Sequence, residues 1–192
     1  EAYLATGTAV LRMNLDDGTT TTAFALPDDS GGVMTLDALP NDRVLVRPRG
    51  SVALEARALA DGARLFAIPL PEMPEHEALA LAVGGNVIAV ADGPVVHLYA
   101  ADDGAFLRKL TADGRIEALA LSPDGRLLAL DTSQVRVYRV ADGAELRVLS
   151  AQPGSVTPPL AWDATGRRLA AWMREGRRDA PEASSVGIYR FD

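Results

Sequence analysis

The sequence predicts an all-β protein built from repeated four-stranded antiparallel sheets. Three observations predict it: a repeat of about 40 residues, tight Gly/Asp turns at fixed places in each repeat, and short apolar or alternating runs between the turns. Ala118–Leu130 reads ALALSPDGRLLAL, and Ala78–Val90 reads ALALAVGGNVIAV in the preceding repeat. Repeats of this length and composition are typical of the blades of a β-propeller.

Two turns recur along the chain and mark the repeat. The first lies between two apolar runs, as in Gly84–Asn86 and Pro123–Gly125. The second is an Asp-Gly pair that follows an alternating run. Its glycines are Gly18, Gly62, Gly104 and Gly143. Gly, Asn and Asp tolerate the positive φ that tight hairpins require, so we expect both turns to connect antiparallel strands.

The first two strands of each repeat are predicted from apolar runs on either side of the first turn. The inner strand is short and rich in small residues, which suits a strand covered on both faces near a central axis. The predicted inner strands are Val33–Leu39, Glu77–Val83, Glu117–Ser122 and Pro159–Trp162. The predicted second strands are Arg43–Val46, Asn86–Val90, Arg126–Leu130 and Arg167–Trp172.

The third strand of a repeat alternates between apolar and polar residues, as in Val135–Arg139 (VRVYR). The fourth strand is polar and mixed, as expected for a strand at the outer edge of a sheet. The predicted fourth strands are Thr19–Leu26, Ala63–Leu70, Ala105–Leu110 and Ala144–Ser150.

About five such units are represented, and we expect them to form one propeller domain over residues 1–192. The approximate blades are 1–30, 31–73, 74–112, 113–151 and 152–192. The first unit begins at its second strand (Ala2–Thr6) and the last ends on its third (Val186–Asp192), so both are expected to be incomplete. We therefore expect a missing upstream segment or a second chain to complete the ring.

The repeats resemble bacterial WD-repeat propellers over nearly the whole chain, and most closely in Glu77–Ser150. Ser122–Ala129 (SPDGRLLA) matches the inner hairpin of that family. The third-strand aromatic is Tyr99, Tyr138 and Tyr189, where the family usually has Trp. The Asp that should follow it and the opening Gly-His pair are both absent, so the hydrogen-bonded network of standard blades cannot form. The resemblance implies a ring that binds protein partners. TolB-like and lactonase-like propellers remain alternatives.

Charge and composition argue against several classes of function. The net charge of −7, from 26 acidic and 19 basic residues, disfavours a binder of nucleic acid or anionic membranes, which needs a basic face. The absence of cysteine excludes disulfides and thiolate chemistry and suits a cytoplasmic protein. All basic residues except Lys109 are arginine, which is typical of a GC-rich bacterial genome. No apolar run approaches the ~18 residues of a membrane helix.

We predict no catalytic, cofactor or metal site. Nucleophile-elbow, P-loop and dinucleotide motifs are absent from the sequence. His76-Glu77 begins like a zinc-protease helix but lacks the second histidine, and His97 is interpreted as a packing or surface residue. The Asp-Gly carboxylates belong to different repeats, so they are expected to close turns rather than bind calcium. Trp162 and Trp172 lie inside apolar strands and are expected to be core.

The best candidate functional segment is a predicted loop at Met173–Ser185, between the second and third strands of the last unit. The matching connections are short, at Asp92–Pro94 and Asp131–Gln134. In a four-stranded blade this connection shares a face with the links between blades, and such faces often bind partners. The candidate partner-binding residues on this face are Arg174, Arg177, Arg178, Arg49 and His76. Arginines can grip a carboxylate-rich partner. The alternative is a solvated loop.

The sequence therefore favours a non-catalytic protein–protein interaction scaffold or sensor module of a larger bacterial protein, with a protein partner that is acidic where it meets the arginines. Two alternatives stay open. One is a hydrolase or ligand-binding propeller with a carboxylate-lined channel, and its only acidic candidates on the inner strands are Asp37, Glu77, Glu117 and Asp163. The other is a propeller fragment whose open edges pair with another chain or copy.

Overall fold

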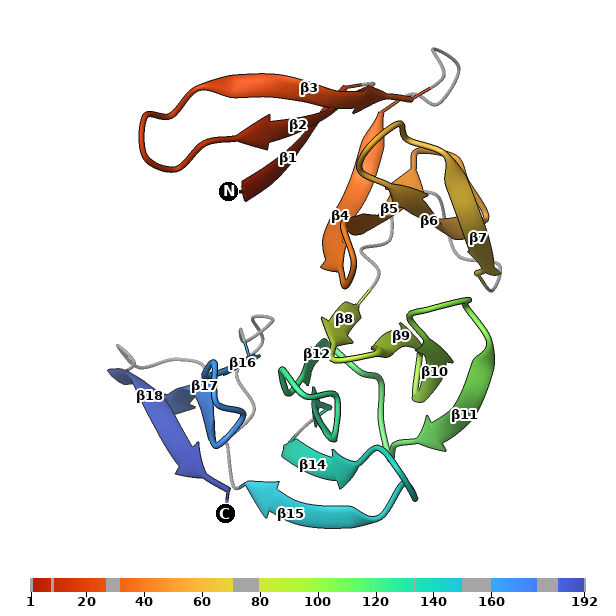
Figure 1. Ribbon diagram of the computed structural model, residues 1–192. Coiled ribbons are helices and arrows are strands. Elements are labelled where there is room, and N and C mark those ends of the chain that lie inside the picture. The colour runs from red at the N-terminus through yellow and green to blue at the C-terminus, as the bar shows by residue number, and fades with distance from the viewer. Residues whose placement is uncertain are drawn as a thin grey trace. The chain divides into compact units, whose positions relative to one another are not determined.

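The computed structural model describes residues 2–7, 9–26, 32–70, 80–132, 134–149, 160–175 and 183–191 (Figure 1). All regular secondary structure in these ranges is β-strand, arranged in five antiparallel sheets. The all-β, antiparallel prediction is thus confirmed. The chain divides into two compact units, Glu1–Ala78 with Ala101–Gly104, and Leu79–Ala100 with Ala105–Asp192.

The first unit holds a three-stranded sheet and a four-stranded sheet. Strands β1 (Ala2–Thr6), β2 (Ala9–Met13) and β3 (Thr20–Ala25) pair in the order β1-β2-β3. Strands β4 (Val33–Leu39), β5 (Arg43–Pro48), β6 (Ala53–Ala58) and β7 (Arg64–Pro69) pair in sequence order. Val10 and Phe24 of the first sheet share one core cluster with Val44 and Val46 of the second. The two sheets therefore stack face to face.

The second unit holds two four-stranded sheets and one three-stranded sheet. The first contains β8 (Leu81–Gly84), β9 (Val87–Asp92), β10 (Val95–Ala100) and β11 (Phe106–Thr111). The second contains β12 (Ala118–Leu121), β13 (Leu127–Asp131), β14 (Val135–Arg139) and β15 (Glu145–Leu149). The third contains β16 (Leu160–Trp162), β17 (Arg168–Glu175) and β18 (Ala183–Arg190). In all three, strands adjacent in the sequence are neighbours in the sheet.

Successive sheets of the second unit stack through opposite faces. We call the face that contacts the next sheet in the sequence the leading face, and the face that contacts the preceding sheet the trailing face. Val96 and Leu98 of β10 lie on a leading face and cluster with Leu128 of β13. Val137 of β14 likewise clusters with Leu169 of β17. Burial of apolar strand faces between sheets is the dominant favourable term in such a core.

The recurrent Asp-Gly turns close through their aspartates. A carboxylate oxygen of Asp17, Asp61 and Asp142 accepts a hydrogen bond from the backbone N–H two residues further along, at 2.8, 2.9 and 3.0 Å respectively. The glycines that follow have φ near +70°, a conformation that residues with a Cβ rarely adopt. These contacts confirm the turn role that the sequence predicts for the carboxylates.

The structure differs from the sequence prediction at the segment Met173–Ser185. Residues Met173–Glu175 continue strand β17, and Ala183–Ser185 begin strand β18, with Met173 opposite Ser185 and Glu175 opposite Ala183. The loop prediction was therefore wrong for the first three and the last three residues of the segment. An antiparallel ladder pairs through backbone N–H and C=O groups, so it can extend over residues whose side chains do not favour a strand. Residues 176–182 lie outside the described residues.

Candidate partner-binding surface

The predicted binding residues fall in different parts of the chain. Arg174 lies in β17, where its backbone is opposite Ser184. Arg49 is exposed in the turn after β5, and its N–H donates to the carbonyl of Gly32 at 2.8 Å. Arg177, Arg178 and His76 lie outside the described residues. Arg49 belongs to the first unit and Arg174 to the second, so their grouping on one face stays a prediction.

The β17–β18 hairpin is longer than its counterparts. Tyr138 is opposite Leu128 and Tyr189 is opposite Leu169, which sets the two hairpins in equivalent register. The β13–β14 ladder ends at Asp131 opposite Val135, the equivalents of Trp172 and Val186.

Beyond that point β17 and β18 continue for three further pairs, as far as Glu175 opposite Ala183. At about 3.3 Å per residue the hairpin extends roughly 10 Å further. Arg174 lies within this extension, so its backbone position is fixed by strand pairing rather than by an open loop. Arg177 and Arg178 follow in the segment that joins the two strands.

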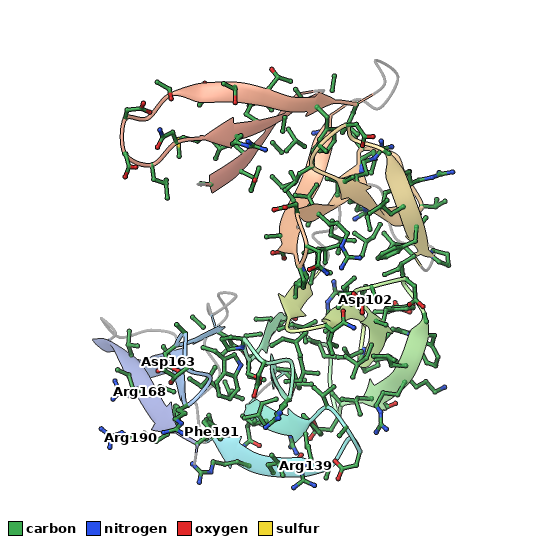
Figure 2. All side chains as sticks on the ribbon, viewed as in Figure 1. Asp102, Arg139, Asp163, Arg168, Arg190 and Phe191 are labelled. Atoms are coloured by element: carbon green, nitrogen blue, oxygen red, sulfur yellow. The ribbon has the colours of Figure 1, made fainter. Side chains whose placement is uncertain are left out.

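Asp163, an acidic candidate for a channel site, is engaged in a turn (Figure 2). Its carboxylate accepts hydrogen bonds from the backbone N–H groups of Arg167 and Arg168, at 2.9 and 3.0 Å, and from the Thr165 hydroxyl at 2.9 Å. Desolvation raises the pKa of Asp163, but these hydrogen bonds outweigh it and hold the pKa below its ordinary value. Asp163 thus closes the β16–β17 hairpin as an anion.

The remaining acidic candidates differ in burial. Asp37 in β4 is partly buried, and burial raises the pKa of its carboxyl. Glu117 is exposed before β12, and Glu77 lies outside the described residues. In the part of the chain that the structure describes, no three His, Asp or Glu side chains gather in a way that could hold a metal ion.

The charge of the Asp131 carboxylate destabilises the folded state at neutral pH. Asp131 ends β13, beside Glu117, whose N–H donates to the Asp131 carbonyl at 2.8 Å. Burial, and then the negative charge of Glu117, raise the pKa of Asp131 above its ordinary value of 3.8. The folded state therefore binds this proton more tightly than the unfolded state. Stability falls as pH rises from 3.8 through the folded pKa, and the cost persists at pH 7.

We expect Asp131→Asn to raise the free energy of unfolding at pH 7 and to lose this advantage below about pH 3.8, where Asp131 is protonated in both states. Urea unfolding at several pH values measures it. Asp124→Asn is the control of opposite sign. The hydrogen bond from Ser122 (2.6 Å) lowers the Asp124 pKa, so this variant should be less stable at pH 7. A destabilised Asp131→Asn variant at pH 7 would contradict the assignment.

Aromatic side chains of the second unit serve packing. The indole N–H of Trp162 donates to the Ala120 carbonyl at 3.1 Å, and its ring lies 5.0 Å from that of Phe191. Trp162 packs against the core shared by two sheets, as predicted. His97 lies 6.4 Å from the Tyr99 ring and 6.3 Å from the Phe106 ring. The side chain of Trp172 lies outside the described residues.

The sheets in the second unit are also joined through their outer strands. Arg147 of β15 donates to the carbonyl of Arg190 at 3.0 Å, and its guanidinium lies 5.1 Å from the centre of the Phe191 ring. Arg190 and Phe191 lie together at the end of β18 (Figure 2). Cation–π contacts of this kind favour arginine over lysine at the junction.

Sequence reasoning missed one feature of this region. Val186 and Ile188 of β18 are exposed, at 63% and 67%, although both are large and apolar. The sequence signal was present in the alternation of the predicted third strand. Alternation gives the face of a strand on which a residue lies, but it does not say what covers that face.

Comparison with known proteins supports the fold. No protein-family model and no curated protein matches the chain. Among solved structures, a chain of the "Crystal Structure of Mitotic Checkpoint Complex" is similar, with a TM-score of 0.66 and 15% sequence identity. The similarity covers 89% of this chain and 53% of that chain, so this chain spans about half the length of its structural relative. At this identity the likeness shows the fold alone, and it fits the predicted WD-repeat-like propeller. In the described residues no helix is long and apolar enough to cross a membrane.

Proposed function

We propose that this chain is a non-catalytic protein–protein interaction module, acting as a scaffold or sensor within a larger bacterial protein. The extended β17–β18 hairpin carries this proposal. In the second unit the β13–β14 ladder ends at Asp131 opposite Val135, and the β9–β10 ladder ends one pair further, at Asp92 opposite Val95. The β17–β18 ladder continues for three pairs beyond the point where β13–β14 ends. An extension confined to one repeat of a repetitive fold adds surface without adding core, and such departures commonly mark a binding face.

The chemistry of the hairpin favours an acidic partner. Arg174 lies in the extension, and Arg177 and Arg178 in the connection that follows. A guanidinium can bind a carboxylate through two parallel N–H···O bonds, which gives both strength and geometric selectivity. The net charge of −7 repels anions in general, so the partner must be recognised by these local cations. Arg49 and His76 are proposed to border the same face.

The proposed setting is cytoplasmic, since a chain without cysteine needs no oxidising compartment. The number of blades in the complete ring stays a prediction. The repeated sheets are proposed to supply the platform for binding, and a few anchor side chains to set the affinity, as is usual at protein interfaces.

The variant R174E/R177E/R178E tests the proposal. We expect the partner captured from its source lysate by the immobilised chain to be lost, because three attractive contacts become repulsive. With the purified partner, calorimetry should show a Kd at least about 100-fold higher, since each charge-assisted hydrogen bond contributes about 1.5–3 kcal/mol.

The matched control is R64E/R115E/R126E. These arginines are 62%, 61% and 84% exposed in their side chains and undergo the same change in charge. The partners of Arg115 and Arg126 are exposed, so those two ion pairs contribute little. Glu55, the partner of Arg64, is 12% exposed and keeps its shorter ion pair with Arg57 at 2.6 Å. Binding that survives in the hairpin variant, or that is lost equally in the control, would refute the assignment of the hairpin as the binding face.

A further inference from the structure

The fourth strands β3, β7, β11 and β15 share one irregularity. In each ladder between a third and a fourth strand the register shifts once, so the fourth strand carries one extra residue there, a β-bulge. The residue that precedes the shift on the third strand has the same kind of partner in all four sheets. These pairs are Val10 with Phe24, Ala56 with Phe66, Leu98 with Arg108, and Val137 with Arg147. A bulge re-aims the side chain beside it, so we call these four partners on the fourth strands the bulge-flanking residues.

In the first unit the bulge-flanking residues are phenylalanines, and each covers the glycine of an Asp-Gly turn. A Cβ on Gly62, between β6 and β7, would lie 2.7 Å from Cδ2 of Phe24, which shares a core cluster with Leu59 of the same turn. A Cβ on Gly104, which belongs to the same unit, would lie 2.6 Å from Cδ2 of Phe66. Carbon atoms that are not bonded to each other pack best at about 3.5–4.0 Å. Each ring therefore occupies the space that a side chain on the glycine would need.

In the second unit the bulge-flanking residues are arginines, and each binds a backbone carbonyl. Arg108 donates through Nη2 to the carbonyl of Ala141 at 2.5 Å, in the turn between β14 and β15. A Cβ on Gly143, the glycine of that turn, would lie 3.3 Å from Nη1 of Arg108. Arg147 donates to the carbonyl of Arg190 at 3.0 Å, at the end of the third strand β18. Two different chemistries thus occupy one position of the repeat and contact the same part of it.

We infer that the bulge-flanking position is a latch that binds the next Asp-Gly turn along the chain, and that phenylalanine and arginine are interchangeable there. A ring gains apolar contact with the backbone of the turn, and a guanidinium gains a charge-assisted hydrogen bond to its carbonyl. The turn glycine leaves room for either one, because it has no Cβ to fill the space. The latch adds a local contact at the outer strands to the burial of apolar faces between sheets. It does not rest on the proposed acidic partner, which meets the arginines of the hairpin.

Exchange of the two chemistries at Arg108 tests the inference by urea unfolding. Arg108→Phe should keep the midpoint of the wild type, because the ring can cover Gly143 as the phenylalanines cover their glycines in the first unit. Arg108→Ala removes the charged donor from the Ala141 carbonyl, so it should raise the unfolding equilibrium constant about tenfold. The matched control is Lys109, which is exposed at the next position of β11. Lys109→Phe and Lys109→Ala should both unfold near the midpoint of the wild type.

A second background, Gly143→Ala, distinguishes the latch from a general gain of apolar surface. The added Cβ takes the place of the ring, so in this background Arg108→Phe should be less stable than Arg108→Ala, the reverse of their order with glycine. Phe66→Arg and Phe66→Ala repeat the comparison in the first unit with the glycine intact, and the arginine variant should be the more stable. The inference is overturned if Arg108→Phe is no more stable than Arg108→Ala with glycine present, if their order is the same in both backgrounds, or if Phe66→Arg is no more stable than Phe66→Ala.

Discussion

Replacing Leu128 with alanine is expected to lower the free energy of unfolding by about 3 kcal/mol, within the range measured for buried leucines. Leu128 is 0% exposed and lies in the core cluster between two stacked sheets, together with Val96 and Leu98 of the preceding sheet. Truncation removes apolar contacts from both sheets and leaves a cavity that strands held in register cannot close.

Urea unfolding followed by circular dichroism measures the effect as a lower midpoint at an unchanged m-value. The matched control is Leu107→Ala in the outer strand β11, where the leucine is 49% exposed, and it should change stability by no more than about 0.5 kcal/mol. Equal, small effects of the two substitutions would contradict the face-to-face stacking of these sheets.

Much of the architecture could be predicted because each local signal has its own physical cause. Positive-φ residues fix the turns, and alternation fixes which side of a strand is apolar. The inner hairpin around Pro123–Gly125 therefore forms where predicted, between β12 and β13. The Asp-Gly turns could be predicted for the same reason, since the carboxylate accepts a hydrogen bond from the backbone of its own turn.

The candidate site could be predicted only in part because it depends on non-local pairing. The residues Met173–Glu175 carry no strong strand signal, and they become strand through the ladder with β18. The exposure of Val186 and Ile188 likewise depends on whether another surface covers them, and their residue types do not indicate this. Asp163 was predicted as an acidic candidate for a channel site. Its carboxylate instead accepts hydrogen bonds from the backbone N–H groups of Arg167 and Arg168, which give it a structural role.

A second large loss of stability is expected from substitution of the turn glycine Gly125. Its φ is +71°, and a Cβ placed there would lie 2.6 Å from the carbonyl oxygen of Gly84 in the preceding sheet. On the other side, the N–H of Gly85 donates to the Pro123 carbonyl at 2.9 Å. The two inner turns are thus in direct backbone contact, and neither backbone can retreat without breaking the hydrogen bond that joins them.

Gly125→Ala should therefore lower the free energy of unfolding by about 3 kcal/mol, the sum of a left-handed backbone penalty of about 1–2 kcal/mol and the displacement of one turn from the other. Gly18→Ala separates the two contributions. Gly18 has the same φ of +71°, but a Cβ there meets nothing within 4 Å, so only the backbone penalty of about 1–2 kcal/mol applies. Urea unfolding of both variants measures the difference. If the two substitutions cost the same, the turns of successive sheets do not touch, and the small residues at this inner turn would reflect hairpin geometry alone.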